Sequence, residues 1–317
     1  MHPALSVIVF TTLCGAGYGL LALLGLYGAV GQLPLDPMFG AVSTLLALGV
    51  VSTGLVASTF HLGHPERAWR ALSQWRSSWL SREVVASEVT YVPAIAFGAG
   101  WVLFGSTTGL WAVSGVLSFV CAATTLICTA YIYRSLKPIP AWSNRWVVPN
   151  YLSLSAMTGA LWLAALATLF GHELKGLSPL VLATIALALV LKLAYWRFID
   201  GSPVASTPES ATGLGFLGKV RLFEAPHTSE NYLLKEMGYR IARKHAQKLR
   251  VIALCLGFFA PFALALVAAS ASGTIVPICW LLAAGIAIVG VLIERWLFFA
   301  EAKHTVTLYY GRELAGS

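Results

Sequence analysis

Two titratable side chains, His61 and Glu83, stand at the facing ends of two apolar segments, and a short stretch rich in tryptophan and arginine separates them. A histidine can donate a hydrogen bond to a ring carbonyl, and a carboxylate can pass protons to or from water. Aromatic side chains such as Trp69 and Trp79 would wall a flat ring. The pattern predicts a quinone-binding site, with Glu88 extending the proton path that starts at Glu83.

Each of the two titratable residues also has a purely structural interpretation. Ser81 would serve as the N-cap of the helix that follows it, and a carboxylate in the first turn of a helix is stabilised by the helix dipole. His61 would in that case merely close the end of the preceding helix. Both interpretations stay open at the level of sequence.

The composition of the chain decides the medium in which these residues work. Its 317 residues have a mean hydropathy of +0.77 and are 58% apolar and only 11% charged, against roughly 25% charged residues in soluble domains. A membrane-spanning helix needs about 20 mostly apolar residues. The sequence contains eight such runs, at residues 4–30, 38–60, 83–105, 109–133, 148–170, 178–199, 251–271 and 275–299. We predict an all-α integral membrane protein, a bundle of eight transmembrane helices in a single membrane domain. The first apolar run is expected to remain as a spanning helix and not to be cleaved as a signal peptide.

The distribution of Lys and Arg predicts the orientation of the bundle. All of these residues except Lys175 and Lys192 fall at the termini, in the loops after spans two, four and six, or beside them. Cationic loops stay on the cytoplasmic side, so we expect both termini and the long loop at 200–250 in the cytoplasm of a bacterium, with the spans in its inner membrane. The net charge of +8 then reflects this bias and attraction to membrane lipids, and nucleic-acid binding is not expected.

Two segments on the basic face carry helical periodicity. Between Glu66 and Leu80, a period of 3.6 residues gathers the aromatic side chains on one side, which predicts an interfacial helix between spans two and three. In the long loop, residues 201–218 are expected to be irregular. Residues 230–250 are expected to form an amphipathic helix, lying on the membrane surface, against a partner, or solvated as a lead into span seven.

Cysteine and histidine placement argues against metal cofactors in this protein. The five cysteines are scattered through apolar runs without a C-x-x-C pair, so no iron–sulfur cluster is expected and each reads as a small buried hydrophobe. A di-haem anchor would need histidine pairs deep in facing helices. The seven histidines lie at span ends or in loops, at positions 2, 61, 64, 172, 227, 245 and 304.

A secondary transporter is the alternative from another class. Transporters of this size commonly show inverted repeats and helices broken near the middle of the membrane. Pro93 and Pro261 are candidate breaks, but the two halves of the sequence do not match.

Four stretches resemble one family. They are FHLGHPERAW, the following SWLSRE, YRSLKPIPAW after span four, and ERWLFF near the end of the last span. Together they are similar to the DmsC-type membrane anchor subunits of dimethyl sulfoxide reductase-like molybdoenzymes, and the similarity covers nearly the whole chain.

The resemblance implies specific roles and partners. In that family the histidine of H-L-G and the glutamate of S-x-E are implicated in quinol binding, which corresponds to His61 and Glu83 here. It also implies that an iron–sulfur subunit and a molybdopterin catalytic subunit dock on the cytoplasmic face, so that the clusters and the molybdenum chemistry belong to partner proteins. Ubiquinone and menaquinone both remain possible.

The long loop departs from the sulfoxide reductase pattern, as does Glu88. The loop is similar instead to that of the anchor of cytoplasmic quinone-linked sulfite dehydrogenases, which implies electron flow from sulfite to quinone; an anchor that oxidises menaquinol for a sulfoxide reductase is the alternative. Arg134, Glu294, Arg295 and His304 also fall near the basic face. Of these, Arg295 is predicted to line the quinone pocket.

Overall fold

The computed structural model describes residues 5–60, 62–202, 206–224 and 244–309. Eight helices in these ranges are long and apolar enough to span a membrane. They are α1 (Leu5–Ala29), α2 (Pro37–Thr59), α3 (Trp79–Leu103), α4 (Leu110–Arg134), α5 (Val147–Leu169), α6 (Leu177–Asp200), the continuous helix Ala246–Ser270 and α12 (Ile275–Ala300). The described ranges contain no β-strand. The predicted all-α bundle of eight spans is confirmed.

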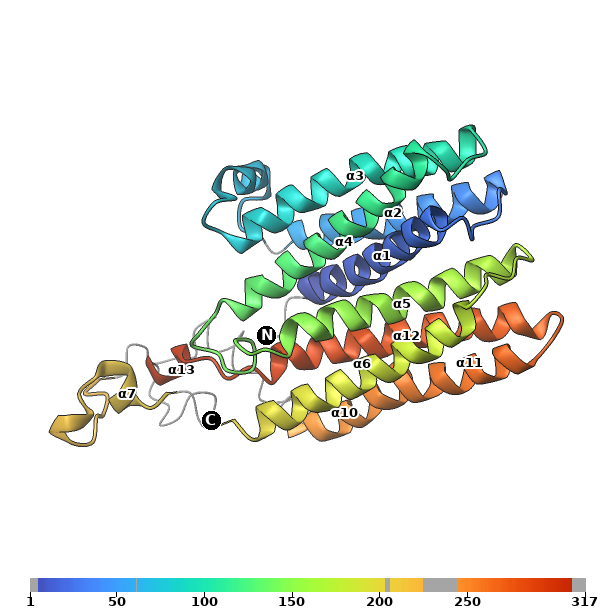
Figure 1. Cartoon of the computed structure of the whole chain (residues 1–317). Helices are drawn as coiled ribbons and strands as arrows, with labels where there is room; N and C mark the ends of the chain where they lie inside the picture. The colour runs from blue at the N-terminus through green and yellow to red at the C-terminus, as the bar shows by residue number, and fades with distance from the viewer. Residues whose placement is uncertain (1–4, 61, 203–205, 225–243, 310–317) are drawn as a thin grey trace.

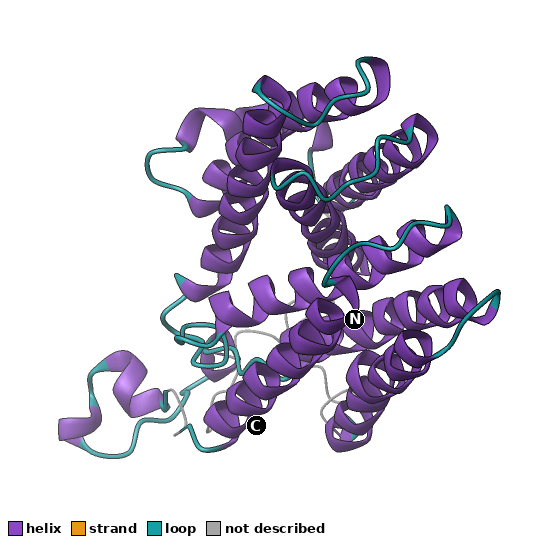
Figure 2. Ribbon diagram, turned by 45° about the vertical axis from the view of Figure 1, so that its right-hand side comes forward, coloured by secondary structure: helices purple, strands orange, loops and turns teal. Residues whose placement is uncertain are grey.

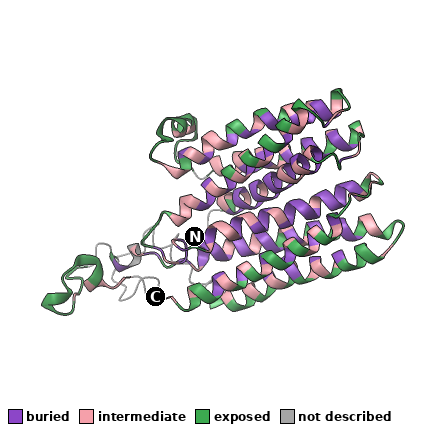
Figure 3. Cartoon of the chain, viewed as in Figure 1, coloured by how far each residue is buried: buried purple, intermediate pink, exposed green. Residues whose placement is uncertain are grey.

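The bundle consists of two groups of helices that meet along α1 and α5 (Figure 1). In the first group, α1 packs against α2 and α4, and α3 packs against α4. In the second, α5 packs against α6 and α12. Buried residues make up 78% of the apolar stretch of α1 and 72% of that of α5, but only 28% in α4 and α6 (Figure 3). The centre of the protein is therefore the contact between α1 and α5.

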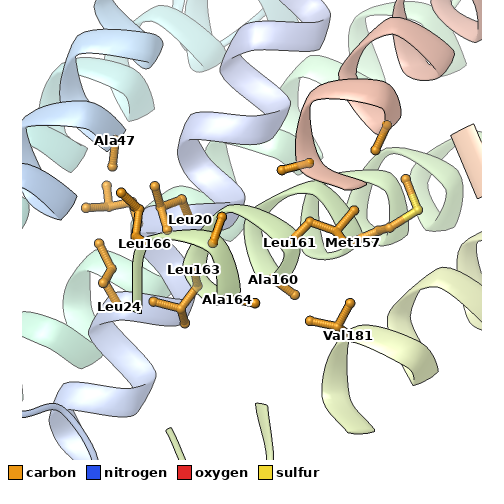
Figure 4. Close-up of a cluster of buried hydrophobic side chains, with 14 of the residues drawn as sticks. Leu20, Leu24, Ala47, Met157, Ala160, Leu161, Leu163, Ala164, Leu166 and Val181 are labelled. Carbon is orange, nitrogen blue, oxygen red and sulfur yellow. The ribbon is translucent and has the colours of Figure 1, made fainter. Parts of the chain in front are cut away.

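Small residues allow α1 and α5 to touch through their backbones. A Cβ atom added to Gly19 would lie 1.9 Å from the carbonyl oxygen of Ser155, and one added to Gly159 would lie 2.2 Å from the carbonyl carbon of Gly19. Such close approach is typical of packing between membrane helices, where apolar burial alone gives little driving force. Leu20, Leu161 and neighbouring side chains fill the space around this contact (Figure 4).

The seventh span is a helix with an irregular middle. It begins at Ala246, earlier than the apolar run predicts, and comprises α10 (Ala246–Leu254), the π-helical turn η3 (Cys255–Phe259) and α11 (Ala260–Ser270). Pro261 lacks an N–H, and the wider turn before it accommodates the lost hydrogen bond. Cys255 is exposed on this turn, which contradicts the expectation that every cysteine is buried; a small apolar thiol is equally suited to contact with lipid.

The two ends of the bundle differ in what they carry. Short loops join the helices at one end, and Figures 1 and 2 show the longer connections at the other. The second end holds η1 (Pro65–Gln74), α7 (Pro208–Thr212), η2 (Gly215–Leu217) and α13 (Val306–Tyr309). The segment expected to be irregular thus contains two short helical turns. Most of the helix expected at 230–250 lies outside the described residues.

Candidate functional site

The helix between α2 and α3 is shorter than the interfacial helix predicted between Glu66 and Leu80. A 3₁₀-helix, η1, ends at Gln74, and α3 begins at Trp79, so Trp79 belongs to the spanning helix. Ser78, not Ser81, is the N-cap, because its side chain accepts a hydrogen bond from the backbone N–H of Ser81. Several serines lie close together here, and only the start of the helix decides which one caps it.

Two side chains of α3 hold η1 against the end of the bundle. The Ser81 hydroxyl donates to the carbonyl of Ala71. Arg82 Nε donates to the carbonyl of Trp75 at 2.9 Å, and its Nη2 donates to the carbonyl of Arg76 at 2.7 Å. These carbonyls lie in or just after the last turns of a short helix and would otherwise need water. Arg82 thus acts as a clasp, a side chain of α3 that holds the end of η1 through two hydrogen bonds. In the sequence it was only one cation among many.

Glu83 lies inside the bundle, directly beneath this clasp. Its side chain is buried, with 5% of its surface exposed. The Thr129 hydroxyl of α4 donates to Glu83 Oε1, and the Ser87 hydroxyl donates to the backbone carbonyl of Glu83 at 2.6 Å. Since α3 begins at Trp79, Glu83 comes after the first turn, and no acidic residue occupies that turn. The helix-dipole explanation for Glu83 is therefore wrong.

A column of stacked groups joins α3 to α4 about one helical turn before Glu83. The Trp79 ring is stacked on that of Tyr131, with centroids 4.4 Å apart. The Arg82 guanidinium lies 4.3 Å from the centroid of Trp79, and that of Arg134 lies 4.9 Å from the centroid of Tyr131. Cations over the faces of an aromatic pair stabilise it electrostatically. This column ties the first turn of α3 to the end of α4.

The other predicted site residues are placed differently. His61 lies outside the described residues; its neighbour Phe60 caps the end of α2. Trp69 is 67% exposed on η1. Glu88 is exposed on α3, whereas Glu83 faces inward. The proton path from Glu83 to Glu88 therefore does not follow one face of α3.

Arg295 belongs to a separate buried cluster in the second group of helices. Its Nη2 donates to Glu294 Oε1 at 2.8 Å, and Lys192 of α6 pairs with the same oxygen. Among the described contacts, Arg295 also lies over the rings of Tyr151 and Phe298. Lys192, which the charge distribution showed only as an exception inside the sixth apolar run, is thus a missed member of this cluster. A single cation in an apolar helix was the available signal.

Two segments that carried the sequence resemblance pack together at the η1 end. The indole N–H of Trp142 donates to the carbonyl of Phe298 at 2.9 Å. Tyr133 packs edge-on against Trp142, Phe298 and Phe299, and His304 packs edge-on against Trp142. Of the remaining residues considered with Arg295, Arg134 lies over the ring of Tyr131 and His304 packs against that of Trp142.

No group of three or more His, Cys, Asp or Glu side chains gathers as a metal site within the described ranges. The described histidines, His64, His172, His245 and His304, all lie outside the spanning helices. The region around Glu83 contains a buried carboxylate, a hydroxyl that holds it and a stacked aromatic pair one helical turn away.

Eight apolar helices around this site define a multi-pass membrane protein. Residues 1–311 match the family model described as DMSO reductase anchor subunit (DmsC). The protein is 36% identical to the C subunit of the sulfite dehydrogenase of Allochromatium vinosum, over 98% of its own length and 99% of that relative. It is 26% identical to the C polypeptide of the anaerobic dimethyl sulfoxide reductase of Escherichia coli, over 50% of its own length and 55% of the relative.

The protein therefore belongs to the DmsC family of membrane anchor subunits of molybdoenzymes. As an anchor subunit it has catalytic and iron–sulfur subunits as partners. The resemblance that the four sequence stretches indicated is confirmed.

Proposed function

We propose that this protein passes electrons between an iron–sulfur partner subunit and membrane quinone, in a complex that oxidises sulfite. The support for sulfite is the 36% identity, over nearly the full length of both proteins, to a subunit of a sulfite dehydrogenase. Half-length similarity to a polypeptide of a dimethyl sulfoxide reductase supports the alternative, in which electrons flow from menaquinol to a sulfoxide reductase.

The observation that carries the quinone assignment is the buried Glu83 carboxylate held by Thr129 beneath η1. A quinone supplies the redox chemistry, because it takes up two electrons and two protons. Glu83 supplies or accepts a proton, and Thr129 fixes the orientation of its carboxylate. A carboxylate inside a membrane bundle is costly when it is charged and unpaired, so its presence favours a function.

The residues around Glu83 fit a flat ring with polar oxygens. The stacked rings of Trp79 and Tyr131, about one turn nearer the end of the bundle than Glu83, would form an aromatic wall for the quinone. Arg82 closes η1 over this region by bonding two carbonyls at its end. His61, which the resemblance to the family implicates in quinol binding, would donate a hydrogen bond to a ring oxygen, and Trp69 of η1 would contribute a further aromatic side chain.

We infer that the end carrying η1 and α7 faces the cytoplasm of a bacterial inner membrane and receives the iron–sulfur subunit. Its connections hold Arg67, Arg145, Lys248 and most of the other cations, whereas Lys175 is at the opposite end. Cationic loops are retained in the cytoplasm. A reporter fused after Ser317 should be active on the cytoplasmic side, and activity outside the cytoplasm would refute this orientation.

The test of function is sulfite-dependent reduction of quinone by the complex extracted in mild detergent. Glu83→Gln keeps the shape of the side chain and removes its titratable group. We expect it to lower the turnover number about tenfold or more while quinone affinity changes less. Electron transfer from sulfite to a soluble dye should be unchanged, because that chemistry happens in the partner subunits.

Glu173→Gln is the matched control, since Glu173 is exposed in the loop at the far end. Wild-type quinone turnover by an assembled Glu83→Gln complex would exclude Glu83 from the site. Robust sulfoxide reduction without sulfite-dependent quinone reduction would instead favour the alternative direction of electron flow.

A further inference from the structure

Three charged side chains lie fully inside the second group of helices. Lys192 of α6 is 1% exposed, and Glu294 and Arg295 of α12 are 0% and 2% exposed. Lys192 precedes the end of α6 at Asp200 by eight residues, which places it about 12 Å inside the bundle at about 1.5 Å per residue. Charges at this depth are expensive and mark functional sites.

The cluster of Lys192, Glu294 and Arg295 has a net charge of about +1 while Lys192 is protonated. Lys192 and Arg295 share the single carboxylate of Glu294, with Lys192 on Oε1 and Arg295 on both oxygens. An arginine stays charged at all physiological pH values, whereas a buried lysine can lose its proton. Release of one proton from Lys192 makes the cluster neutral, so this group can exchange protons.

Other titratable groups lie near the cluster on α5, α6 and α10 and just after α12. The ring centroid of Tyr151 of α5 lies 4.3 Å from the Arg295 guanidinium carbon, and the ring centroid of Tyr195 of α6 lies 4.2 Å from Lys192 Nζ. Glu301 follows the last residue of α12. Lys192 Nζ and the Arg250 guanidinium lie 4.9 and 5.2 Å from the centroid of the Trp196 ring. Arg250 of α10 donates to Glu301 Oε1 at 2.7 Å.

Towards the η1 end, this arrangement reaches water. Arg250 also bonds both carboxylate oxygens of Asp200, whose side chain is 53% exposed. Two buried polar atoms of the residues around Arg250, Glu301 Oε2 and Trp196 Nε1, have no hydrogen-bond partner among the described residues. Buried polar atoms are normally satisfied, and a bridging water is the common solution.

On its α1 and α5 side, the cluster borders a small cavity that several polar side chains line. Arg295, Thr12, Tyr151 and Ser155 are among its lining residues, and about 10 Å³ is open to the centre of a water-sized molecule, enough for about one water. The hydroxyls of Thr12 and Tyr151 have no hydrogen-bond partner of good geometry among the described residues. Two such hydroxyls beside a guanidinium provide the polar contacts that a bound water requires.

Two tyrosines connect this cavity with the region of Glu83. Tyr133 of α4 is stacked on Tyr151 with centroids 6.1 Å apart. Tyr133 follows Thr129, the donor to Glu83, by one turn of α4, and Tyr151 lies under the Arg295 guanidinium. The two tyrosines therefore lie between the two buried charged centres, at a contact between the two groups of helices.

We propose that Lys192 and Glu294 form a proton-exchange site, which takes protons from the η1 end through Glu301 and delivers them, through water in the cavity at Tyr151 and Thr12, to the region of Glu83. The Lys192 amine takes up a proton to become an ammonium ion, and passes it on through Glu294 to return to the amine. No electron moves and no other bond forms or breaks. The proposal rests on the proposed function, since the protons serve quinone reduction.

The decisive variant is Lys192→Arg, which keeps the ion pair but does not release a proton. We expect the complex to assemble, to reduce a soluble dye with sulfite at the wild-type rate, and to reduce quinone about tenfold more slowly with a larger solvent deuterium isotope effect. A purely structural ion pair predicts wild-type quinone turnover. Lys248→Arg, on the exposed side of α10, is the control and should behave as wild type.

A second pair of variants leaves the ion pairs intact and applies even where Lys192→Arg does not assemble. Tyr151→Phe and Thr12→Val remove the two cavity hydroxyls, and we expect each to slow quinone turnover severalfold. Thr44→Val removes an equally buried, unpartnered hydroxyl from α2 and should have no effect. Wild-type turnover by both cavity variants, or by an assembled Lys192→Arg complex, overturns the proposal.

Failure of this inference is distinct from failure of the proposed function. If the wild-type complex does not reduce quinone with sulfite, the proposed function is wrong. If the wild type reduces quinone and Glu83→Gln impairs it while the Lys192 and cavity variants match the wild type, only the proton route is wrong.

Discussion

Thr129 of α4 donates a hydrogen bond to the buried carboxylate of Glu83 in α3, across 46 residues of sequence. The same hydroxyl lies 3.0 Å from the carbonyl of Thr125, one turn earlier in α4. The carboxylate is therefore fixed by a side chain that is itself anchored to a helix. A rigid second residue of this kind is what a proton-transferring carboxylate needs to keep one orientation.

The first prediction concerns this contact. Thr129→Val has nearly the same shape but leaves one oxygen of a buried carboxylate without its donor, a loss of about 1–3 kcal/mol. We expect quinone turnover to fall about three- to tenfold in complexes that assemble normally. Thr129→Ser restores the donor and should recover most of the rate. Equal turnover by the valine and serine variants would show that the hydroxyl is dispensable.

The second prediction concerns the clasp between α3 and η1. Arg82→Ala removes two hydrogen bonds to the carbonyls of Trp75 and Arg76, and both carbonyls then depend on water. We expect amide hydrogen exchange in η1 to accelerate about tenfold or more, while exchange in the spanning part of α3 changes little. Arg67→Ala, on the exposed side of η1, is the matched control. Unchanged exchange in Arg82→Ala would mean that other contacts hold η1.

The third prediction concerns the contact between the two groups of helices. Gly159→Val places side-chain atoms where the backbone of Gly19 already lies, 2.2 Å from the new Cβ. Overpacking of this kind costs about 1–3 kcal/mol or more, so thermal unfolding in detergent should occur at a clearly lower temperature. Gly49→Ala is the control, because nothing lies within 4 Å of a Cβ at Gly49. A Gly159→Val protein as stable as wild type would refute the close contact.

The fourth prediction uses pH at the opposite end of the bundle. The hydrogen bond from His172 Nε2 to Asp36, 2.9 Å long, and further bonds from the backbone N–H groups of Phe39 and Met38 hold the pKa of Asp36 below its usual range. A lowered pKa in the folded state stabilises the protein above the unfolded pKa of about 3.9, and this contribution is lost as the pH falls through the folded pKa.

Asp36→Asn should therefore unfold at a lower temperature than wild type at neutral pH, and the difference should narrow once the pH drops below about 4. Asn still accepts a bond at the N-cap, so the variant isolates the charge. Glu173→Gln, next to His172 but exposed, controls for charge in the same loop. A difference that stays constant down to acid pH would contradict the assignment.

The sequence by itself determined the eight-helix membrane fold and the family. A hydrocarbon layer about 30 Å thick demands long apolar runs whose backbone bonds are satisfied within the helix, and that demand is local and visible in composition. Glu83 could also be selected from sequence, because a carboxylate at a span end beside an aromatic segment is unusual in such a protein.

The tertiary structure decided which residues meet. Lys192, Glu294 and Arg295 come together only because α6 packs near α12 through α5, and Thr129 reaches Glu83 only because α3 and α4 are paired. Spacing along one helix shows which face a residue occupies, but it does not show what occupies the facing helix. In a membrane, packing between helices is set by close backbone contacts such as Gly19 with Gly159 rather than by apolar burial, so these partnerships become visible only once the helices are placed.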